Sequence, residues 1–307
     1  MSIDYHRRML ADGIRNDAFA RALKQVIVPG KTTVADIGAG TGILGFLAAK
    51  LGAKKVYLYE QGPVIEVARK LASENRLRNC MFVHHHSTRV RRPPHVDLVI
   101  CETLGNFAYE ENILESLDDA KRFLKASGGT IMPSGITQYA APLIDDRLWR
   151  ELIAWRKIGF GLAFDAAEDA TLNNVYVRTV QEKDLLGEPQ EWDRVLFPGK
   201  NGSIRKGDLS WEIDRDAAVY GFALWWEATL VPGIALSTSP LDPPTHWEQI
   251  ILPLRAPLRV RARDRVRLGI ASDSRWQTGI NVQWQATHLR SGRMLTRQAY
   301  DMQKGML

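Results

Sequence analysis

The chain has 307 residues, of which 45% are hydrophobic, and a formal net charge of +6. This length is enough for two domains with their own cores. It holds no apolar run of about 18 residues, and its first eight residues have no apolar signal core, so we expect neither a membrane span nor a membrane partner. Cys80 and Cys101 are too few for a disulfide framework, which favours a reducing, cytoplasmic location.

The positive charge raises the question of nucleic-acid binding. The densest basic clusters lie at residues 89–92 and 258–267. The second cluster alternates basic and apolar residues, as the solvated face of a strand does, and neither cluster is interleaved with aromatic residues. A nucleic-acid partner is therefore the less favoured interpretation.

The first part of the chain alternates between strand and helix patterns. Residues 4–27 have helical spacing that breaks at Gly13. Apolar runs then predict strands, and the segments between them predict helices, which is the pattern of a parallel sheet wound with right-handed crossovers. The expected strands are 33–37, 55–59, 80–84, 96–101 and 129–133, and the expected helices are 43–51, 63–76 and 111–125.

The composition changes after residue 134, where strand-like runs separated by turn residues take over. This pattern predicts an antiparallel, barrel-like second domain. A helical insertion at about residues 146–172, with Trp149 and Trp155, interrupts it. We expect domains at 1–134 and 135–307, the second with strands at 136–143, 174–180, 217–230, 247–254, 258–270 and 280–288.

A glycine-rich turn follows the first expected strand. Gly38, Gly40 and Gly42 alternate in it, Asp36 comes just before them, and Glu60 ends the next strand about 20 residues later. Glycines let a ligand approach the backbone, and an acidic residue at this spacing suits ribose hydroxyls. A structural turn or an NAD site has a similar pattern, but the G-x-G-x-G spacing favours S-adenosyl-L-methionine (SAM).

Carboxylates gather where the fourth strand ends. Glu102 follows an apolar strand directly, and Glu110 and Glu111 come just before a helix. Acidic residues near a helix N-terminus have an ordinary structural explanation, which does not cover Glu102. Two carboxylates in one cavity raise each other's pKa unless a cation lies between them, and a guanidinium pairs with carboxylates through its planar fork.

Four motifs together carry a resemblance to a known family. They are H-R-R-M-L-A-D-G-I-R at 6–15, D-I-G-A-G-T-G-I-L at 36–44 with Glu60, the segment from Glu102 to Glu111, and T-H-W at 245–247. In this order they are similar to the protein arginine N-methyltransferase family of class I SAM-dependent methyltransferases, in a short bacterial-type form. The resemblance implies a Rossmann-like SAM-binding domain, a β-barrel, and an inserted helical arm that pairs subunits into a homodimer.

The resemblance also implies roles for single residues. The catalytic residues would be Glu102, Glu111, His246 and Asp12. The substrate site would add Met9 and Trp247 to Glu102, Glu111 and His246, and no metal ligands are expected. The cofactor SAM, leaving as S-adenosyl-L-homocysteine, would contact Arg15, Asp36, Gly38, Gly40, Gly42, Ile43, Leu44, Glu60, His86, Ser87 and Glu102.

Departures from the family pattern leave the methyl acceptor open. Ser87 replaces a glutamate that faces the adenine amine, and Thr103 and Asn106 replace a tryptophan and a tyrosine. A basic chain also attracts arginine-rich tails weakly. The family resemblance makes methylation of arginine in a protein or peptide the expected function. The alternatives are a small guanidino compound such as free arginine, or a catalytically silent protein that binds SAM or nucleic acid.

Overall fold

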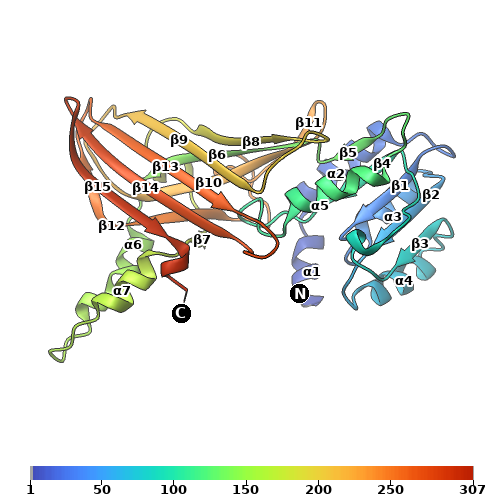
Figure 1. The fold of residues 1–307 in the computed structure, drawn as a ribbon, viewed down its shortest axis with the longest axis horizontal. Coiled ribbons are helices and arrows are strands. Elements are labelled where there is room, and N and C mark those ends of the chain that lie inside the picture. Colours follow the sequence, from blue (N-terminus) through green and yellow to red (C-terminus); the bar gives the residue numbers. More distant parts are fainter. Residues whose placement is uncertain (1–2, 307) are drawn as a thin grey trace.

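The structure is a computed structural model that describes residues 3–306. A five-stranded parallel sheet forms one end of the molecule (Figure 1). Its strand order, β3-β2-β1-β4-β5, reverses direction between β1 and β4, so the loops after these two strands frame a crevice. β4 is buried along its whole length, as expected where both faces of a sheet are covered. The strands are β1 (Thr33–Ile37), β2 (Lys55–Tyr59), β3 (Cys80–Val83), β4 (Leu98–Cys101) and β5 (Thr130–Met132).

Helices connect these strands and precede them. The break predicted at Gly13 separates two helices, and Asp12 caps the second by accepting a hydrogen bond from the backbone N–H of Arg15 (2.9 Å). No helix within residues 3–306 combines the length and the apolar composition needed to cross a bilayer. The helices are α1 (Ile3–Leu10), α2 (Gly13–Val26), α3 (Ile43–Lys50), α4 (Ile65–Glu74) and α5 (Ile113–Ala120).

Two antiparallel sheets form the barrel-like body at the other end (Figure 1). One has the order β7-β12-β10-β6-β8 with β11 beside β10, and the other has the order β15-β14-β13-β9. Trp284 of β14 donates a hydrogen bond to the carbonyl of Pro253 in β12 (3.1 Å) and so joins them. The strands are β6 (Gly135–Leu143), β7 (Tyr176–Arg178), β8 (Gln190–Leu196), β9 (Ile204–Glu212), β10 (Ala217–Val231), β11 (Ile234–Ser237), β12 (Gln249–Val260), β13 (Arg265–Asp273), β14 (Asn281–Arg290) and β15 (Arg293–Asp301).

The single strand predicted over 258–270 is wrong. The chain turns there between β12 and β13, where Arg263 has a φ of +69° and Asp264 accepts a hydrogen bond from the backbone N–H of Arg261 (2.8 Å). The basic residues of this segment are exposed, as predicted, but they lie on two strands and a turn. The prediction also missed β8, β9, β11 and β15.

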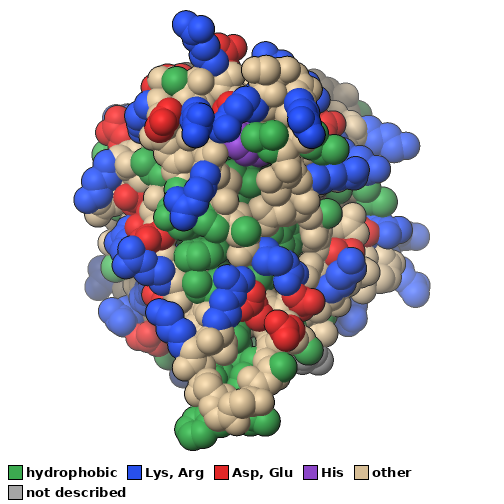
Figure 2. Space-filling model, turned by 90° about the vertical axis from the view of Figure 1, so that its left-hand side faces the viewer, with side chains coloured by type: hydrophobic (Ala, Val, Ile, Leu, Met, Phe, Trp, Pro, Cys, Tyr) green, Lys and Arg blue, Asp and Glu red, His purple; other side chains and the backbone are tan. Residues whose placement is uncertain are grey.

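The helical insertion leaves the barrel between β6 and β7. It contains α6 (Arg147–Leu152) and α7 (Asp165–Leu172), which project from the body in Figure 1. Trp149 packs against Tyr220, and Trp155 stacks on Phe164, so both tryptophans are used within the chain. Figure 2 looks onto this end of the molecule: basic side chains are dispersed among acidic ones, and apolar side chains gather at the bottom tip.

Candidate active site

A cavity of about 700 Å³ lies at the carboxyl edge of the parallel sheet, where β1, β2, β3 and β4 end. Two of the predicted residues, Asp12 and Gly42, do not line it: Asp12 lies behind His246, and Gly42 caps α3. The remaining predicted residues line this one cavity and are Met9, Arg15, Asp36, Gly38, Gly40, Ile43, Leu44, Glu60, His86, Ser87, Glu102, Glu111, His246 and Trp247.

The glycine turn brings the backbone itself into the cavity wall. Gly38 has a φ of +70°, and a Cβ atom there would lie 2.8 Å from the methyl group of Thr103. Gly40 has a φ of +54°, and its missing side chain makes room for the ring of His6. Both positions therefore require glycine. The turn leads into α3, whose first N–H groups have no partner within a helix and suit an anionic or polar ligand.

Glu60 is fixed at the end of β2 by backbone donors. One oxygen of its carboxylate, Oε2, accepts a hydrogen bond from the N–H of Gly40 (3.0 Å), and Oε1 accepts one from the N–H of Gly62 (2.6 Å). The carboxylate thus bridges the glycine turn and the loop that follows β2. It retains acceptor capacity toward the cavity, because each carboxylate oxygen has two lone pairs.

Asp36 is buried below the glycine turn. Its Oδ2 accepts a hydrogen bond from the N–H of Gly45 in α3 (2.8 Å). Burial raises the pKa of Asp36 to about 7, and the nearby carboxylate of Glu102 adds to this, although the bond from Gly45 opposes it. Asp36 therefore ties the end of β1 to α3.

Glu102 is paired with Arg15, and both residues line the cavity. The Nε of Arg15 donates to Oε2 of Glu102 (3.0 Å), and a terminal guanidinium nitrogen of Arg15 donates to the same oxygen. Both side chains are almost completely buried. Arg15 was expected at the cofactor and Glu102 at both the cofactor and the substrate, and the structure joins these two residues to each other.

Glu111 lies at the mouth of the cavity, just before α5. Desolvation by the surrounding protein raises the pKa of its carboxyl group to about 7, and the neighbouring carboxylates of Glu102 and Glu110 add to this rise. No ion pair within residues 3–306 reaches Glu111, whereas Glu102 has Arg15. Glu111 is therefore the carboxylate on which an incoming cation would have the larger effect.

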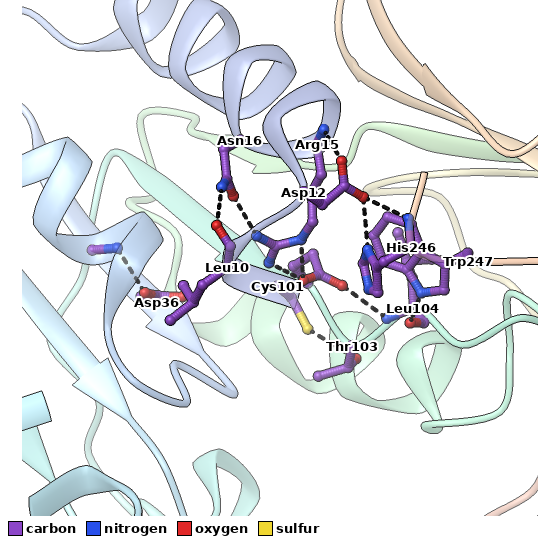
Figure 3. A network of polar contacts seen from close by, with 12 residues as sticks. Leu10, Asp12, Arg15, Asn16, Asp36, Cys101, Thr103, Leu104, His246 and Trp247 are labelled. Carbon is purple, nitrogen blue, oxygen red and sulfur yellow. Dashed lines mark hydrogen bonds and ion pairs between the residues drawn. The ribbon is translucent and has the colours of Figure 1, made fainter. Parts of the chain in front are cut away.

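Asp12 and His246 form a hydrogen-bonded pair at the wall of the cavity (Figure 3). Nδ1 of His246 donates to Oδ2 of Asp12 (2.8 Å), and so does the backbone N–H of His246 (2.8 Å). Burial alone would raise the pKa of Asp12, but hydrogen bonds from Arg15 and His246 outweigh it and lower the pKa. Burial lowers the pKa of His246, which favours a neutral imidazole whose other nitrogen, Nε2, can accept a proton.

Barrel residues hold the loop between Glu102 and Glu111 in place. Trp226 donates from its indole to the carbonyl of Gly105, and Trp247 donates to the carbonyl of Leu104, both at 2.9 Å. The hydroxyl of Tyr109 donates to Asp193 of β8 (2.6 Å). The spacing between the two carboxylates is therefore set by the antiparallel body as well as by the parallel sheet.

Asn106, one of the departures from the family pattern, is part of this attachment. Its side-chain oxygen accepts a hydrogen bond from the backbone N–H of Glu248, the residue after the T-H-W segment (2.9 Å). The residue thus links the two loops that carry the expected acceptor site.

The cavity is acidic although the chain is basic. Its described lining contains four carboxylate residues and one arginine, Arg15. The low dielectric inside a cavity strengthens the attraction of this excess negative charge for a cation. The cavity therefore favours a cationic ligand, whatever the net charge of the chain.

Several lining residues were not predicted as site residues. His6 is buried, and its Nδ1 has no hydrogen-bond partner in the described part of the chain. It begins the motif at 6–15, so the sequence did contain a signal for it. Ser116 on α5 and Trp276 on the β13–β14 loop also line the cavity, and no sequence motif marks either residue.

Two family models match this chain. One is described as ribosomal protein L11 methyltransferase (PrmA) and matches residues 20–157, and the other is the arginine methyltransferase oligomerization subdomain and matches residues 136–288. Protein arginine N-methyltransferase 6 of Xenopus tropicalis is 29% identical over 274 residues, covering 84% of this chain and 80% of the relative. The probable protein arginine N-methyltransferase 6 of Arabidopsis thaliana is 27% identical, covering 94% of this chain and 76% of the relative.

Solved structures share the whole fold. The Trypanosoma brucei PRMT1 enzyme–prozyme heterotetrameric complex with AdoHcy has a TM-score of 0.88 at 21% identity, covering 97% of this chain and 98% of that chain. Protein arginine methyltransferase 10 of Arabidopsis thaliana has a TM-score of 0.84 at 21% identity, covering 98% of each chain. The arrangement of a parallel sheet followed by an antiparallel body, predicted from the sequence, is confirmed by this likeness.

Proposed function

The chain belongs to the protein arginine methyltransferase family, and we propose that it transfers the methyl group of SAM to a guanidino nitrogen of arginine in a protein or peptide. The observation that carries this proposal is that Glu102 and Glu111 line the same cavity as the glycine turn and Glu60. A site for the cofactor alone does not need Glu102 and Glu111 in addition to Glu60. A guanidinium does need a pair of carboxylates, because it presents five N–H donors in a planar fork.

The residues present fit SAM. A cavity of about 700 Å³ is within the ordinary range for small-molecule sites. We assign Glu60 to the ribose hydroxyls and Arg15 to the methionine carboxylate. Ser87 fits a hydrogen bond to the base at the end of the cavity near β3, because it is buried and its hydroxyl has no hydrogen-bond partner within residues 3–306. A buried polar atom of this kind is costly unless a ligand or water satisfies it.

The paired carboxylates prepare the acceptor for attack. When bound, the cofactor supplies an electrophilic methyl group on a sulfonium, and S-adenosyl-L-homocysteine is the product. Glu102 and Glu111 hold the guanidinium by charge-assisted hydrogen bonds and draw its positive charge toward the nitrogens that they contact. The nitrogen facing the methyl group then keeps more of its lone pair. Orientation of this kind supplies up to about 7–11 kcal/mol of the barrier reduction.

A proton must leave the methylated guanidinium. His246 is the acceptor that we propose, because burial lowers its pKa and Asp12 holds its Nδ1–H, which leaves Nε2 for the proton. Glu111 is the rival acceptor, since its pKa of about 7 in the unliganded cavity allows it to take a proton.

A small guanidino compound is the second candidate acceptor. The net charge of +6 favours it, because a basic chain does not steer arginine-rich tails toward itself. The acidic lining suits either acceptor, so the two candidates differ in what lies outside the cavity.

Incubation with isotopically labelled SAM tests the proposal. The pure chain would be given arginine-containing peptides, free arginine or a cell lysate, followed by amino-acid analysis of the products. Methylarginine in peptide or lysate protein supports the proposal. Label in free arginine alone would favour the second candidate. Binding of S-adenosyl-L-homocysteine without any transfer would indicate a catalytically silent protein.

We also propose that two copies pair through the helical insertion. The family model over residues 136–288 is described as an oligomerization subdomain. At the tip of the insertion, Phe160 is 91% exposed and Leu162 is 66% exposed. Large apolar side chains that gather on one exposed tip indicate an interaction surface, and a second copy is the partner that this family model favours.

We also propose a domain boundary and a location in the cell. We place the boundary at 134/135, because the last parallel strand ends at Met132 and the first antiparallel strand begins at Gly135. We propose a reducing, cytoplasmic compartment, which the two free thiols of Cys80 and Cys101 support.

A further inference from the structure

The loop between β13 and β14 carries a barrel side chain to the parallel sheet. Trp276 of this loop lines the cavity, and its ring lies edge-on to that of His86, with centroids 4.8 Å apart and an interplanar angle of 89°. Its backbone N–H donates to the carboxylate of Glu115 in α5 (2.9 Å). One residue of the antiparallel body thus contacts both the loop after β3 and the helix after β4.

The loop that presents Trp276 is fixed by its own hydrogen bonds. Asp273 accepts from the backbone N–H of Arg275 (3.1 Å) and from its Nε (3.0 Å). The carbonyl of Arg275 in turn accepts from the N–H groups of Thr278 (2.8 Å) and Gly279 (3.0 Å). The indole therefore needs little ordering when a ligand arrives, and this reduces the entropic cost of contacting it.

The order of the strands locates the nucleoside base. Arg15 and Glu102 lie at the end of β4, and Glu60 lies two strands away at the end of β2. If SAM binds in an extended form, with its methionine carboxylate at Arg15 and its ribose at Glu60, its base lies farther along the same edge of the sheet, where β3 ends. His86 lies there against Trp276, and next to His86 in the chain is Ser87, whose buried hydroxyl has no hydrogen-bond partner among the described residues.

We propose that Trp276 forms the outer wall of the adenine site and contacts the base of the bound cofactor. The inference rests on the proposed function only in taking this cavity as the SAM site. Trp276 remains 47% exposed in the structure, so it has aromatic surface available for a ligand. A purine stacks readily on an indole, and the contact would join the barrel to the parallel sheet through the cofactor.

Binding measurements with substituted chains test this inference. Titration calorimetry would compare S-adenosyl-L-homocysteine and adenosine as ligands of the wild type, Trp276→Ala and Trp276→Phe. Loss of an aromatic contact with a base predicts that Trp276→Ala weakens both ligands by about tenfold, and by the same factor, because the change affects only the base. Trp276→Phe keeps an aromatic ring and should keep most of the affinity.

Two further variants serve as a control and as a second test. Gln277→Ala is the matched control, because Gln277 is an exposed residue of the same loop that does not line the cavity, and its affinities should equal those of the wild type. Trp276→Leu keeps apolar bulk but has no aromatic face, so it decides the matter if the alanine variant folds poorly. It should weaken both ligands as Trp276→Ala does.

The outcomes separate this inference from the proposed function. Wild-type adenosine affinity in Trp276→Leu and Trp276→Ala would overturn the role of Trp276 and leave methyl transfer standing. The predicted loss of affinity in a chain that transfers no methyl group would support Trp276 and overturn the proposed function. A wild-type chain that binds neither adenosine nor S-adenosyl-L-homocysteine would overturn both.

Discussion

Carboxylates within one small region of this molecule ionise differently because their neighbours differ. Asp12 receives hydrogen bonds from two backbone N–H groups and an imidazole, and its pKa is lowered. Asp36 is buried with one backbone donor, and its pKa rises to about 7. Glu111 is desolvated by the surrounding protein and stands near other carboxylates, and its pKa also rises to about 7. Of these three carboxylates, Glu111 is the one that we propose to contact a cationic substrate and so to change its ionisation on binding.

This placement predicts a pH dependence of substrate binding. Because the folded-state pKa of Glu111 is raised to about 7 from its ordinary 4.5, the group is protonated below pH 7 and ionised above it. A guanidinium binds the ionised form better. The affinity for an arginine peptide, measured with S-adenosyl-L-homocysteine present, should therefore rise by up to about tenfold per pH unit below pH 7 and level off above it.

Glu111→Gln is the control for this profile. Glutamine has no charge to lose, so the variant should bind the peptide weakly and with little change between pH 6 and pH 8. A wild-type affinity that stays constant over this range would contradict the assignment, and so would an unchanged slope in the variant.

At the scale of elements, the loop between Glu102 and Glu111 depends on the antiparallel body. Tyr109→Phe removes the hydroxyl that donates to Asp193 (2.6 Å) while Arg205 still pairs with this carboxylate. We expect the free energy of unfolding to fall by about 1.5 kcal/mol, as for one hydrogen bond to a charged group. Turnover should also fall, because the carboxylate spacing loosens, while the affinity for S-adenosyl-L-homocysteine stays near that of the wild type.

Chemical denaturation and steady-state kinetics would check this expectation. Tyr57→Phe is the control, since Tyr57 lies on β2 and no hydrogen bond of its hydroxyl is found within residues 3–306. Equal stability and turnover of Tyr109→Phe and the control would show that the bond from Tyr109 to Asp193 does not hold the loop.

The sequence predicted the strands that are apolar runs, and two of the strands that it missed face solvent along most of their length. The strands of the parallel sheet are apolar runs covered on both faces, so their composition alone predicts them. In β9 and β15, by contrast, most residues are exposed and many are polar or charged. Both are edge strands: β9 pairs with β13, which is distant in the sequence, whereas β15 pairs with β14 across the short turn at Ser291 and Gly292.

The candidate site shows the same division. The glycine turn, Glu60, Glu102 and Glu111 could be predicted, because each stands at the end of a predicted strand or the start of a predicted helix. The contact between Trp276 and His86 could not, because it joins residues about 190 positions apart through an exposed loop with no motif. The pairing of Arg15 with Glu102 likewise depends on how α2 lies over the sheet.

At the scale of the whole molecule, the tip of the helical insertion exposes Phe160 and Leu162 although its helices pack on the barrel. Phe160→Ser should convert the dimer that we propose into a monomer, because loss of a buried aromatic anchor weakens an interface by at least about thirtyfold. Light scattering after size-exclusion chromatography would measure the mass. Met294→Ser is the control, since Met294 is 56% exposed on β15, away from the insertion. A wild-type monomer, or a dimer that survives Phe160→Ser, would contradict this role.

The proposed reaction requires Glu102 and Glu111 to hold a guanidinium beside the cofactor. The most direct measurement is methyl transfer to an arginine peptide by Glu111→Gln, together with its affinity for S-adenosyl-L-homocysteine. Turnover should fall by at least about a hundredfold, as when an electrostatic partner of a reaction is removed, while the cofactor product still binds as to the wild type. Wild-type turnover in this variant would show that Glu111 does not hold the guanidinium.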